Sequence, residues 1–473
     1  MSGMKTRSIA LGAAILLLSL GRAVARPYTL DELIEMARRG NPGIAAGGAA
    51  ALAMQSQVSE ARRNWLPSGD LLSFVAPVPD IRCAGPNQVK IDGVDADGEP
   101  LRDSNCVTTA QDPLHNPSIL TNLKGAWTRT ELRLVQPLFD FGKISAGVSA
   151  AEAGVEALRD KQAGTASDVE LNVRRAYWGY KLARDLLDAL DEGSGYVDQA
   201  QKQIDKQLEN GTGTATVTDR LRLRTVRAEV DARMLEAKRL QDLAMLGLQT
   251  LLGSSAPADL QVDDAPFEAL VIPPRPVSFY EARARVSRPE VLALAQAVRA
   301  KHALSDLERR RMYPDLVLIG TASFAYAPTV DTPRNAFLSN PFNSLGAGIA
   351  AALRMQLDLG PKLARADRVH AEATEMDLRQ EEALGGILLE VRKSYGEVTE
   401  ATARVEALHK GERAGKSWIA ATSQNFAIGL AETRDFSDSL NAFFQMRARY
   451  LQSIYDLNVA AAALARATGA PVP

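Results

Sequence analysis

The stretch Gln136-Pro137-Leu138-Phe139-Asp140-Phe141-Gly142 separates two segments with different periodicities. Before it, residues 126–138 alternate between polar and apolar side chains, which is the two-residue period of a strand. After it, residues 143–209 contain no proline and carry an apolar seam with alternating spacings of 4 and 3, the heptad pattern of packed helices. The stretch therefore predicts a direct step from a strand into a very long helix.

The predicted helix is much longer than a globular domain requires. At about 1.5 Å of rise per residue, residues 143–209 would extend over roughly 100 Å, so the helix must pack against others along most of its length. Its seam consists of Val169, Val173, Ala176, Tyr180, Ala183, Leu187 and Leu190. A similar seam occurs later in the chain, at Leu384, Leu388, Val391, Tyr395, Val398 and Val405. We expect both long helices to end at glycine-containing turns, over residues 210–213 and 428–429, and to return as a second helix.

The chain also repeats itself, which indicates an internal tandem duplication. Asp140-Phe141-Gly142 matches Asp358-Leu359-Gly360 at a shift of 218 residues. Two further sets of matches follow the same order along the chain. At a shift of 247 residues, Asn41-Pro42 matches Arg288-Pro289, and Pro67 matches Pro314. At a shift of 216 residues, Gly213 matches Gly429, and Gly253 matches Gly469. The larger shift of the first set means that the first copy has 29 extra residues between Pro67 and Asp140.

The matches divide the chain into a first repeat over residues 26–252, a proline-rich linker or equatorial segment over 253–276, and a second repeat over 277–473. Each repeat is expected to contain a short helix, a longer helix that ends before a proline, two strands and a long helical hairpin. The helices are predicted at about 29–40 and 43–65, and at 277–287 and 289–312. The strands are predicted at about 68–76 and 126–138, and at 315–326 and 345–358. The hairpins are predicted at 143–252 and 361–469.

The strand segments alternate over roughly 10–13 residues, which is the length of a transmembrane β-strand. Residues 345–358 show the pattern most clearly, because apolar side chains occupy every second position. An ordinary half-buried hairpin would give the same alternation, so both interpretations remain open at this point. Aromatic residues lie near the expected strand ends, where a membrane girdle would place them: Trp65, Trp127, Phe139, Tyr313 and Phe324.

The N-terminus has the features of an export signal. Lys5 and Arg7 precede an apolar run over residues 9–20, and Ala23-Val24-Ala25 supplies a small-residue cleavage site. We therefore expect residues 1–25 to be a cleaved signal peptide. The alternative is an N-terminal membrane anchor, but the run is shorter than the roughly 20 residues that span a bilayer. No later stretch reaches 18 consecutive apolar residues, so no transmembrane helix is expected.

Cys83 and Cys106 are the only cysteines, and both lie in a loop rich in Pro, Gly, Asn and Asp, over residues 77–124. In an exported protein such a pair predicts a disulfide that closes the loop. Two free thiols are the alternative.

Composition excludes several classes of function. The chain has 55 basic and 57 acidic residues, so its net charge of −2 gives no field that would recruit nucleic acid. The four histidines have no metal-ligand partner at helical spacing, and two cysteines cannot complete a zinc site. No dinucleotide loop and no nucleophile–base pattern is present. We therefore expect neither an enzyme nor a bound metal or cofactor.

The whole predicted mature chain resembles the TolC-type outer-membrane efflux proteins. That family has a duplicated unit of two strands and a long helix, a Pro-Leu-Phe-Asp-x-Gly step into the helix, and glycine turns followed by aspartate. Residues 137–142 match the step, and the second copy keeps Leu357-Asp358-Leu359-Gly360. The resemblance implies a mainly α-helical homotrimer. Each protomer would contribute four strands to one 12-stranded β-barrel in the lipid of the cell outer membrane, continued by a periplasmic α-helical barrel.

The function that the resemblance implies is a passive exit duct for a tripartite efflux system or a type I secretion system. Its partners would be a periplasmic adaptor and an inner-membrane pump of the resistance-nodulation-division, ABC or major facilitator type. The competing interpretation is a periplasmic coiled-coil adaptor or scaffold without a channel. An adaptor would have one helical hairpin between β segments, whereas this sequence has two hairpins in tandem.

The resemblance also implies functional residues at the two glycine turns, which would form the periplasmic tip. The turn residues expected to contact the adaptor are Gly213, Thr214, Ala215, Gly429, Leu430 and Ala431. The residues expected to form a periplasmic gate are Asp435, Asp438, Thr218, Asp219 and Arg434. In a trimer the paired aspartates Asp435 and Asp438 would ring one narrow opening and favour cations.

Two of the family's latch residues are absent. Phe426 stands where the family has a tyrosine, and Ala431 where it has an arginine, so Arg434 is a candidate substitute. The alternative role for Asp219 and Asp435 is compensation of the positive charge at a helix N-terminus.

Overall fold

The computed structural model describes residues 26–78, 82–83, 106–107, 123, 125–211, 215–330, 332 and 340–469, with the backbone alone at 82–83 and 106–107. The expected signal peptide, most of the cysteine loop, Gly213 and Thr214 lie outside these residues. The chain forms two compact units. The first comprises the residues up to Ala46, Gly164–Arg288 and those from Leu388 onward, and the second comprises Gly47–Ala163 and Pro289–Ile387. Each unit takes residues from both sequence repeats, so one repeat is not one compact body.

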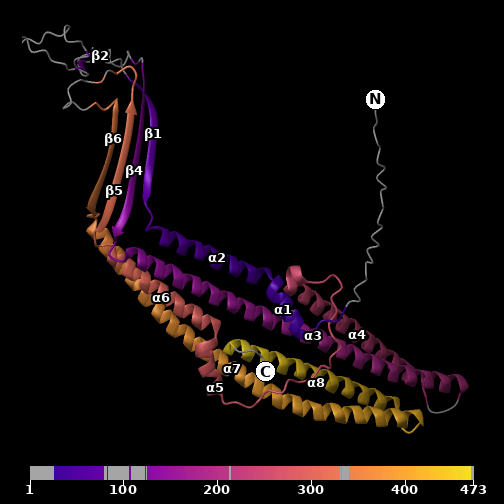
Figure 1. The fold of residues 1–473 in the computed structure, drawn as a ribbon. Coiled ribbons are helices and arrows are strands. Elements are labelled where there is room, and N and C mark those ends of the chain that lie inside the picture. The colour runs from indigo at the N-terminus through magenta and orange to yellow at the C-terminus, as the bar shows by residue number, and fades with distance from the viewer. Residues whose placement is uncertain are drawn as a thin grey trace, which may run out of the picture. The chain divides into compact units, whose positions relative to one another are not determined.

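A four-stranded antiparallel sheet belongs to the second unit. It consists of β1 (Ser68–Val78), β4 (Gly125–Phe139), β5 (Asp315–Tyr326) and β6 (Ser344–Arg354), in the order β1-β4-β5-β6 (Figure 1). The pairs β1–β4 and β5–β6 each come from one sequence repeat, and the β4–β5 pair joins the two repeats. The predicted strand partners are thus confirmed.

The end of β6 differs from the prediction, which extended this strand to residue 358. The strand ends at Arg354 because its partner there is Asp315, the first residue of β5, so no backbone is left to pair with the next residues. The Asp358 carbonyl instead accepts a hydrogen bond from the backbone N–H of Lys362 in the first turn of the following helix.

Four helices contribute to the second unit: α2 (Pro42–Arg63), α6 (Pro289–Arg310), and the parts nearest the sheet of α3 (Lys143–Asn210) and α7 (Leu359–Ala427). α2 and α6 end four residues before Pro67 and Pro314, two residues earlier than predicted. In both cases a short turn fills the gap before the proline, because the residue preceding a proline disfavours helical geometry.

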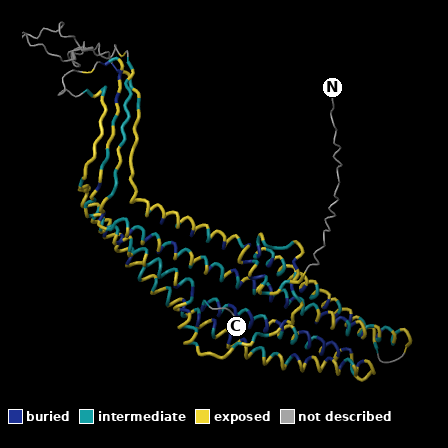
Figure 2. The backbone as a smooth tube through the Cα atoms, in the orientation of Figure 1, coloured by how far each residue is buried: buried dark blue, intermediate teal, exposed yellow. Residues whose placement is uncertain are grey.

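The first unit contains α1 (Leu30–Gly40), α4 (Val217–Leu252), the short 3₁₀ helix η2 (Gly253–Ser255), α5 (Val277–Ser287), α8 (Thr433–Thr468) and the remainder of α3 and α7. The expected seams contribute to its interior: Val173 on α3 and Val391 on α7 are fully buried. A second apolar cluster near the hairpin turns includes Leu223 of α4 and Phe436 of α8. Figure 2 shows the buried positions recurring along these helices, as heptad packing requires.

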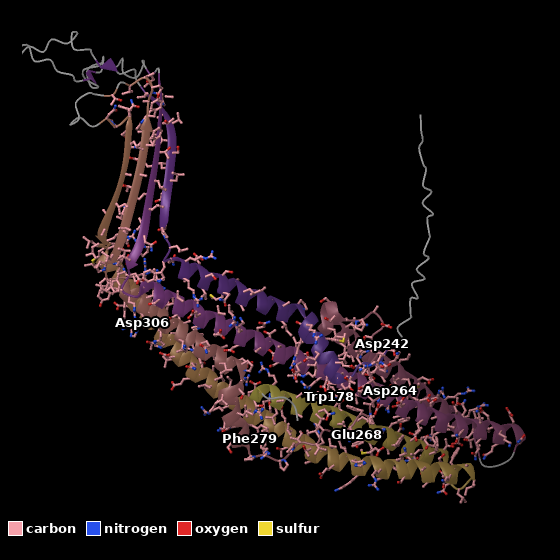
Figure 3. The ribbon with its side chains drawn as sticks, viewed as in Figure 1. Trp178, Asp242, Asp264, Glu268, Phe279 and Asp306 are labelled. Carbon is pink, nitrogen blue, oxygen red and sulfur yellow. The ribbon has the colours of Figure 1, made fainter. Side chains whose placement is uncertain are left out.

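The linker over residues 253–276 packs within the first unit and is held there by buried hydrogen bonds and an ion pair. The Lys181 ammonium of α3 is fully buried and donates to Asp263 Oδ1 at 2.5 Å and to the Ala265 carbonyl at 2.8 Å. The Tyr177 hydroxyl donates to the same carboxylate at 2.8 Å. The Asn458 amide of α8 donates to the Glu268 carbonyl at 2.9 Å. Figure 3 labels Asp264 and Glu268 of this linker and the buried Trp178 of α3.

Candidate functional site

The register of the sheet sorts its side chains onto two faces of opposite character, because successive residues of a strand point to opposite sides. Aligned across the four strands, one set of positions forms an apolar face with Leu71, Val75, Leu132, Leu134, Leu316, Leu318, Phe324, Leu345, Ile349 and Leu353. The alternate positions form the face that carries the charges, called the polar face here: it holds Asp70, Arg129, Glu131, Arg133, Thr321 and Ser323, together with the apolar residues Leu72, Phe74, Val317 and Ile319.

The apolar face is open in the protomer. Leu345 and Ile349 of β6 are 86% and 80% exposed. Ser73 and Thr130 are polar residues on this face, and their hydroxyls form a hydrogen bond with each other at 2.9 Å. The outer edges of β1 and β6 have no partner strand within the sheet. An exposed apolar face with two open edges would promote aggregation in water, so the sheet requires an apolar solvent and further strands.

Charged groups on the polar face lie beside groups of opposite charge. Arg129 Nε donates to Glu131 Oε1 at 2.6 Å, and the Arg129 guanidinium lies 5.8 Å from the ring centre of Trp127. Asp70 of β1 lies directly opposite Arg133 of β4. Such a face suits an aqueous environment.

The second candidate site is the pair of turns that join the long helices. Gly211 and Gly429 have φ angles of +66° and +82°, a left-handed conformation that favours glycine after a helix. Ile428 and Leu430 are exposed apolar residues at the α7–α8 turn, and Leu430 is 77% exposed. Of the other predicted turn residues, Ala215 and Ala431 are half-buried.

Asp219 caps the N-terminus of α4. The Thr216 hydroxyl and backbone N–H donate to Asp219 Oδ2 at 2.6 and 3.0 Å, and the Asp219 N–H donates to Thr216 Oγ1 at 3.2 Å. Burial alone would raise the pKa of Asp219. Hydrogen bonds from Thr216 and from the Thr433 hydroxyl, with the charge of Arg222, instead lower this pKa below its usual value. Thr218, the neighbouring predicted gate residue, is exposed.

Asp435 occupies the equivalent place at the start of α8. The backbone N–H of Glu432 donates to Asp435 Oδ2 at 3.4 Å, so Asp435 also takes part in a helix cap. Asp438 lies one turn further along, with Arg434 Nε 3.9 Å from its Oδ2. The side chains of Asp435, Asp438 and Arg434 are all exposed in the protomer. Arg434 is therefore paired along its own helix with Asp438.

Two residues that sequence reasoning missed connect the hairpins near the turns. The Gln203 amide of α3 donates to the carbonyls of Phe426 and Ala427 at the end of α7, at 2.9 and 3.1 Å. The buried Thr433 at the start of α8 lies close enough to Asp219 at the start of α4 to help lower the pKa of that carboxyl. Gln203 and Thr433 are ordinary polar residues in charged helical sequence, so no pattern distinguishes them.

The absence of the tyrosine hydroxyl at position 426 also has a structural consequence. Phe426 is buried and packs against Phe436, with ring centres 5.2 Å apart. The position contributes to the apolar cluster and makes no side-chain hydrogen bond.

The backbones of the two cysteines are paired. β2 (Arg82–Cys83) and β3 (Cys106–Val107) form a short antiparallel ladder in which Cys83 is directly opposite Cys106. Opposed Cα atoms in such a ladder are about 4.5–5.5 Å apart. That separation falls within the range that a disulfide bridges, about 4.4–6.8 Å.

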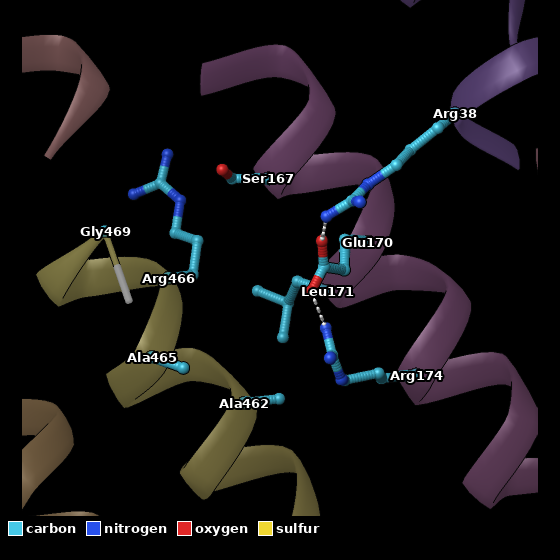
Figure 4. Close-up of a pocket in the computed structure, with 9 residues that line it drawn as sticks. All are labelled: Arg38, Ser167, Glu170, Leu171, Arg174, Ala462, Ala465, Arg466 and Gly469. Atoms are coloured by element: carbon cyan, nitrogen blue, oxygen red, sulfur yellow. Dashed lines mark hydrogen bonds and ion pairs between the residues drawn. The ribbon is translucent and has the colours of Figure 1, made fainter. Parts of the chain in front are cut away.

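A polar pocket of about 230 Å³ lies between α1, α3 and α8 in the first unit (Figure 4). Arg38 donates to Glu170 at 2.8 Å, and Arg174 also pairs with Glu170. Burial alone would raise the pKa of Glu170, but the hydrogen bonds and charges of Arg174 and Arg38 lower it. Arg466, on the α8 side, pairs with Asp168 at 2.7 Å. Each arginine that lines the pocket thus has a carboxylate partner, which is typical of a structural ion-pair network.

In the part of the chain that the structure describes, no three His, Cys, Asp or Glu side chains are grouped as metal ligands. Over the same residues, no helix combines the length and the apolar character needed to cross a bilayer.

Comparison with known proteins gives a match that covers most of the chain. The family model "Outer membrane efflux protein" matches residues 114–254 and 282–470, which is one segment in each repeat. Among curated proteins, the chain is 25% identical to the alkaline protease secretion protein AprF of Pseudomonas aeruginosa, over 69% of this chain and 66% of AprF. It is 23% identical to the cobalt-zinc-cadmium resistance protein CzcC of Cupriavidus metallidurans, over 75% of this chain and 81% of CzcC.

Among solved structures, the fold is similar to that of the outer-membrane channel CmeC of Campylobacter jejuni. The TM-score is 0.70 at 13% sequence identity, over 93% of this chain and 85% of CmeC. A channel protein thus has a fold similar to that of this chain.

Proposed function

The chain belongs to the outer membrane efflux protein family, and from that premise we propose that three copies assemble into one duct that a periplasmic adaptor and an inner-membrane pump engage. The family accounts for the main features of the molecule. The chain is an outer-membrane exit duct with a periplasmic helical extension, and the expectation that it is not an enzyme is confirmed, because members of this family are passive conduits. The rival interpretation, an adaptor or scaffold without a channel, is rejected.

The observation that carries the proposed assembly is the sheet, with its exposed apolar face and unpaired edges on β1 and β6. In lipid every backbone polar group must be paired, so an open edge is not tolerated there. Pairing β6 of one copy with β1 of the next would remove both edges. Three protomers would then close a 12-stranded barrel with the apolar face toward lipid and the polar face toward a water-filled lumen.

The exposed turn residues support the adaptor proposal. Leu430 and Ile428 at one turn, and Val217 and Leu221 at the start of α4 beside the other, present apolar side chains to solvent. A partner that buries them would gain about 25 cal/mol for each Å² removed from water. We assign adaptor docking to this surface, together with the predicted residues Gly213, Thr214, Ala215, Gly429 and Ala431.

The names of the relatives suggest two kinds of cargo. AprF is a protease secretion protein and CzcC is a cobalt-zinc-cadmium resistance protein. An ABC pump would fit the first kind of cargo and a resistance-nodulation-division or major facilitator pump the second. For this chain we propose service in either a secretion system or an efflux system.

The gate proposal concerns Asp435 and Asp438. Their carboxylates are exposed in the protomer, so a threefold ring could place six of them around one opening. Like charges in a narrow passage attract cations and repel anions. The test is single-channel recording in planar bilayers with the Asp435→Ala, Asp438→Ala double variant. We expect a larger conductance and a weaker cation preference than in the wild-type channel.

A matched control removes two carboxylates far along the sequence from the turns. Asp242→Ala and Asp264→Ala both replace exposed aspartates, and neither residue is within a helix turn of a gate residue in sequence. These replacements should leave conductance and selectivity unchanged. Currents of the Asp435→Ala, Asp438→Ala variant that equal those of the wild type would exclude the two aspartates from the gate.

We further propose that the closed state is held in part by two cross-hairpin contacts: the hydrogen bonds of Gln203 to the end of α7, and the approach of Thr433 to the Asp219 carboxyl. In this chain these contacts take the place of the family's tyrosine and arginine latch. Gln203→Ala would remove both hydrogen bonds of the Gln203 amide. We expect this variant to open more often in the same recordings, whereas Gln241→Ala, at a distant site on α4, should not.

A further inference from the structure

The foot of the sheet, where strands meet helices, carries an exposed aromatic cluster formed by Phe139, Phe141 and Tyr313. The rings of Phe139 and Phe141 lie 4.8 Å apart, and Phe141 stacks on Tyr313 at 5.3 Å. All three residues are exposed. Phe139 belongs to the apolar face, since it pairs with Leu316, so the cluster continues that face to its end.

Phe141 is held in an unusual conformation. Among the described residues it is the one non-glycine with a positive φ angle, at +54°. A left-handed conformation costs an ordinary residue about 1 kcal/mol or more, and such strain is found at functional positions more often than elsewhere. Because the ring is 40% exposed, burial in a core does not account for this conformation.

The second repeat has the same exposed apolar step. The shift of 218 residues places Leu357 and Leu359 at the positions of Phe139 and Phe141, and both leucines are exposed. An apolar band therefore borders the foot of the sheet in both copies. Trp65, also exposed, extends it on the side of β1, where its carbonyl accepts a hydrogen bond from the Gln136 amide of β4 at 2.6 Å.

Arginines accompany this band at equivalent positions of the two repeats. Arg63 and Arg310 end α2 and α6, and each precedes the proline before its strand by four residues. Arg310 donates to the carbonyls of Phe141 and Gly142 at 3.4 and 3.5 Å, so its guanidinium lies beside the strained residue.

Arg63 and Arg310 differ from nearby basic residues because they have no carboxylate partner among the described residues. Arg62 pairs with Glu152, and Lys143 pairs with Asp315 at 2.6 Å. Within the described part of the chain, neither Arg63 nor Arg310 has a carboxylate within ion-pair distance. A guanidinium has five N–H donors in a planar fork that matches phosphate oxygens, and the two long bonds of Arg310 leave most of its donors available.

We propose that Arg63 and Arg310 bind the phosphate of an anionic phospholipid at the inner boundary of the membrane, with the aromatic cluster against its acyl chains. This inference rests on the proposed function, which places the apolar face in lipid. At the end of that face, headgroup phosphates replace acyl chains, and exposed rings and cations are the side chains that suit this depth. The duplication would supply two equivalent phosphate contacts in each protomer.

The test compares the thermal stability of the purified trimer in phosphatidylcholine vesicles with and without phosphatidylglycerol, and in phosphatidylcholine with inorganic phosphate. We expect phosphatidylglycerol to raise Tm for the wild type, and inorganic phosphate to leave it unchanged. The double variant Arg63→Gln, Arg310→Gln should lose the rise. The control Arg299→Gln, Arg379→Gln removes the same charge from exposed helical positions and should keep it.

An equal rise in the Arg63→Gln, Arg310→Gln variant, or no rise in the wild type, would refute the lipid site. A rise with inorganic phosphate would identify a site for free phosphate instead. Recording channels from the same phosphatidylcholine vesicles separates this inference from the proposed function. If the trimers conduct but phosphatidylglycerol does not change their Tm, the proposed duct stands and the lipid site is refuted. If no channels are recorded, the proposed duct itself is refuted.

Discussion

At the scale of single residues, Gly193 on α3 shows how closely the long helices approach. A Cβ added there would lie 2.0 Å from Cζ of Phe444 on α8, so the phenylalanine ring packs directly against the glycine backbone. Gly195, two residues further along the same helix, has nothing within 4 Å of such a Cβ. The two glycines therefore differ in their packing, although they lie only two residues apart on the same helix.

We predict opposite effects of alanine at these two positions. Gly193→Ala forces Phe444 to move and should destabilise the protein by about 1–3 kcal/mol, the usual cost of overpacking. Gly195→Ala should stabilise it by up to about 1 kcal/mol, because alanine favours helix more than glycine does. Denaturant unfolding of both variants at equal protein concentration measures the difference. Equal effects would mean that Phe444 does not occupy the space beside Gly193.

Lys181 is the residue that anchors the linker over 253–276, through hydrogen bonds to Asp263 and Ala265. Replacing it with methionine removes the ammonium and its three hydrogen bonds, to Asp263 Oδ1 and to the carbonyls of Asp263 and Ala265. We expect a loss of about 3–5 kcal/mol, as for other broken buried pairs. Lys238→Met, which removes an exposed helical pair with Asp242, should cost less than about 1 kcal/mol. Protease cleavage within residues 253–276 should rise in the first variant alone.

The same anchor predicts a pH dependence. Burial alone would raise the pKa of Asp263, but the hydrogen bonds of Lys181 and Tyr177 lower it, so its stabilising effect is lost as the pH falls below about 4. Burial and the bond to Asp263 raise the pKa of Tyr177, so its contribution is present below about pH 10 and lost above that value.

Hydrogen exchange over residues 253–276 would detect both limits. We expect protection between about pH 4 and 10, and weaker protection with little pH dependence in Asp263→Asn. Identical profiles for the variant and the wild type would show that the anchor does not control the linker.

At the scale of elements, the sheet makes the sharpest prediction, because adjacent residues of β6 belong to opposite faces. Ile349→Arg places a charge on the apolar face, where lipid would cost about 2–4 kcal/mol near the membrane midplane. Ala350→Arg places the same charge on the polar face. We expect the first variant to reduce the amount of heat-modifiable oligomer in outer-membrane fractions and the second to leave it near the wild-type level. Similar losses in both would argue against a lipid-facing side.

The cysteine ladder is the other element that can be tested directly. If Cys83 and Cys106 form the predicted disulfide, a maleimide should label neither residue until a reductant is added. The opposed backbones of β2 and β3 support this expectation. Ready labelling without reductant would show that both thiols are free.

At the scale of the whole molecule, the question is how one chain with four strands forms a duct. The proposed answer is a trimer, because both edges of the sheet and its apolar face remain unsatisfied in one copy. We predict that detergent-solubilised protein has the mass of three chains and loses its sheet signal by circular dichroism only when heat dissociates the oligomer. A monomer that keeps this sheet signal would contradict the assembly.

The sequence by itself determined the elements and their duplication. Alternation marked β4 and β6, and β1 and β5 were inferred as their partners. The heptad seams marked α3 and α7, because side-chain periodicity is a local property of a strand or helix. Glycine turns and prolines set most boundaries for the same reason. The family resemblance then supplied the function and the turn residues, since the step at residues 137–142 and its second copy are distinctive.

Only the tertiary structure decided which distant residues meet. The end of β6, the contacts of Gln203 and Thr433, the anchor at Lys181 and the close approach at Gly193 all depend on a partner far away in sequence. It also showed that each compact unit combines both repeats and that one register sorts four strands into two faces. The periodicity of the sequence determines which side of a helix or strand is apolar. It does not determine which other element that side contacts, because the relative positions of distant elements are not encoded in any local pattern.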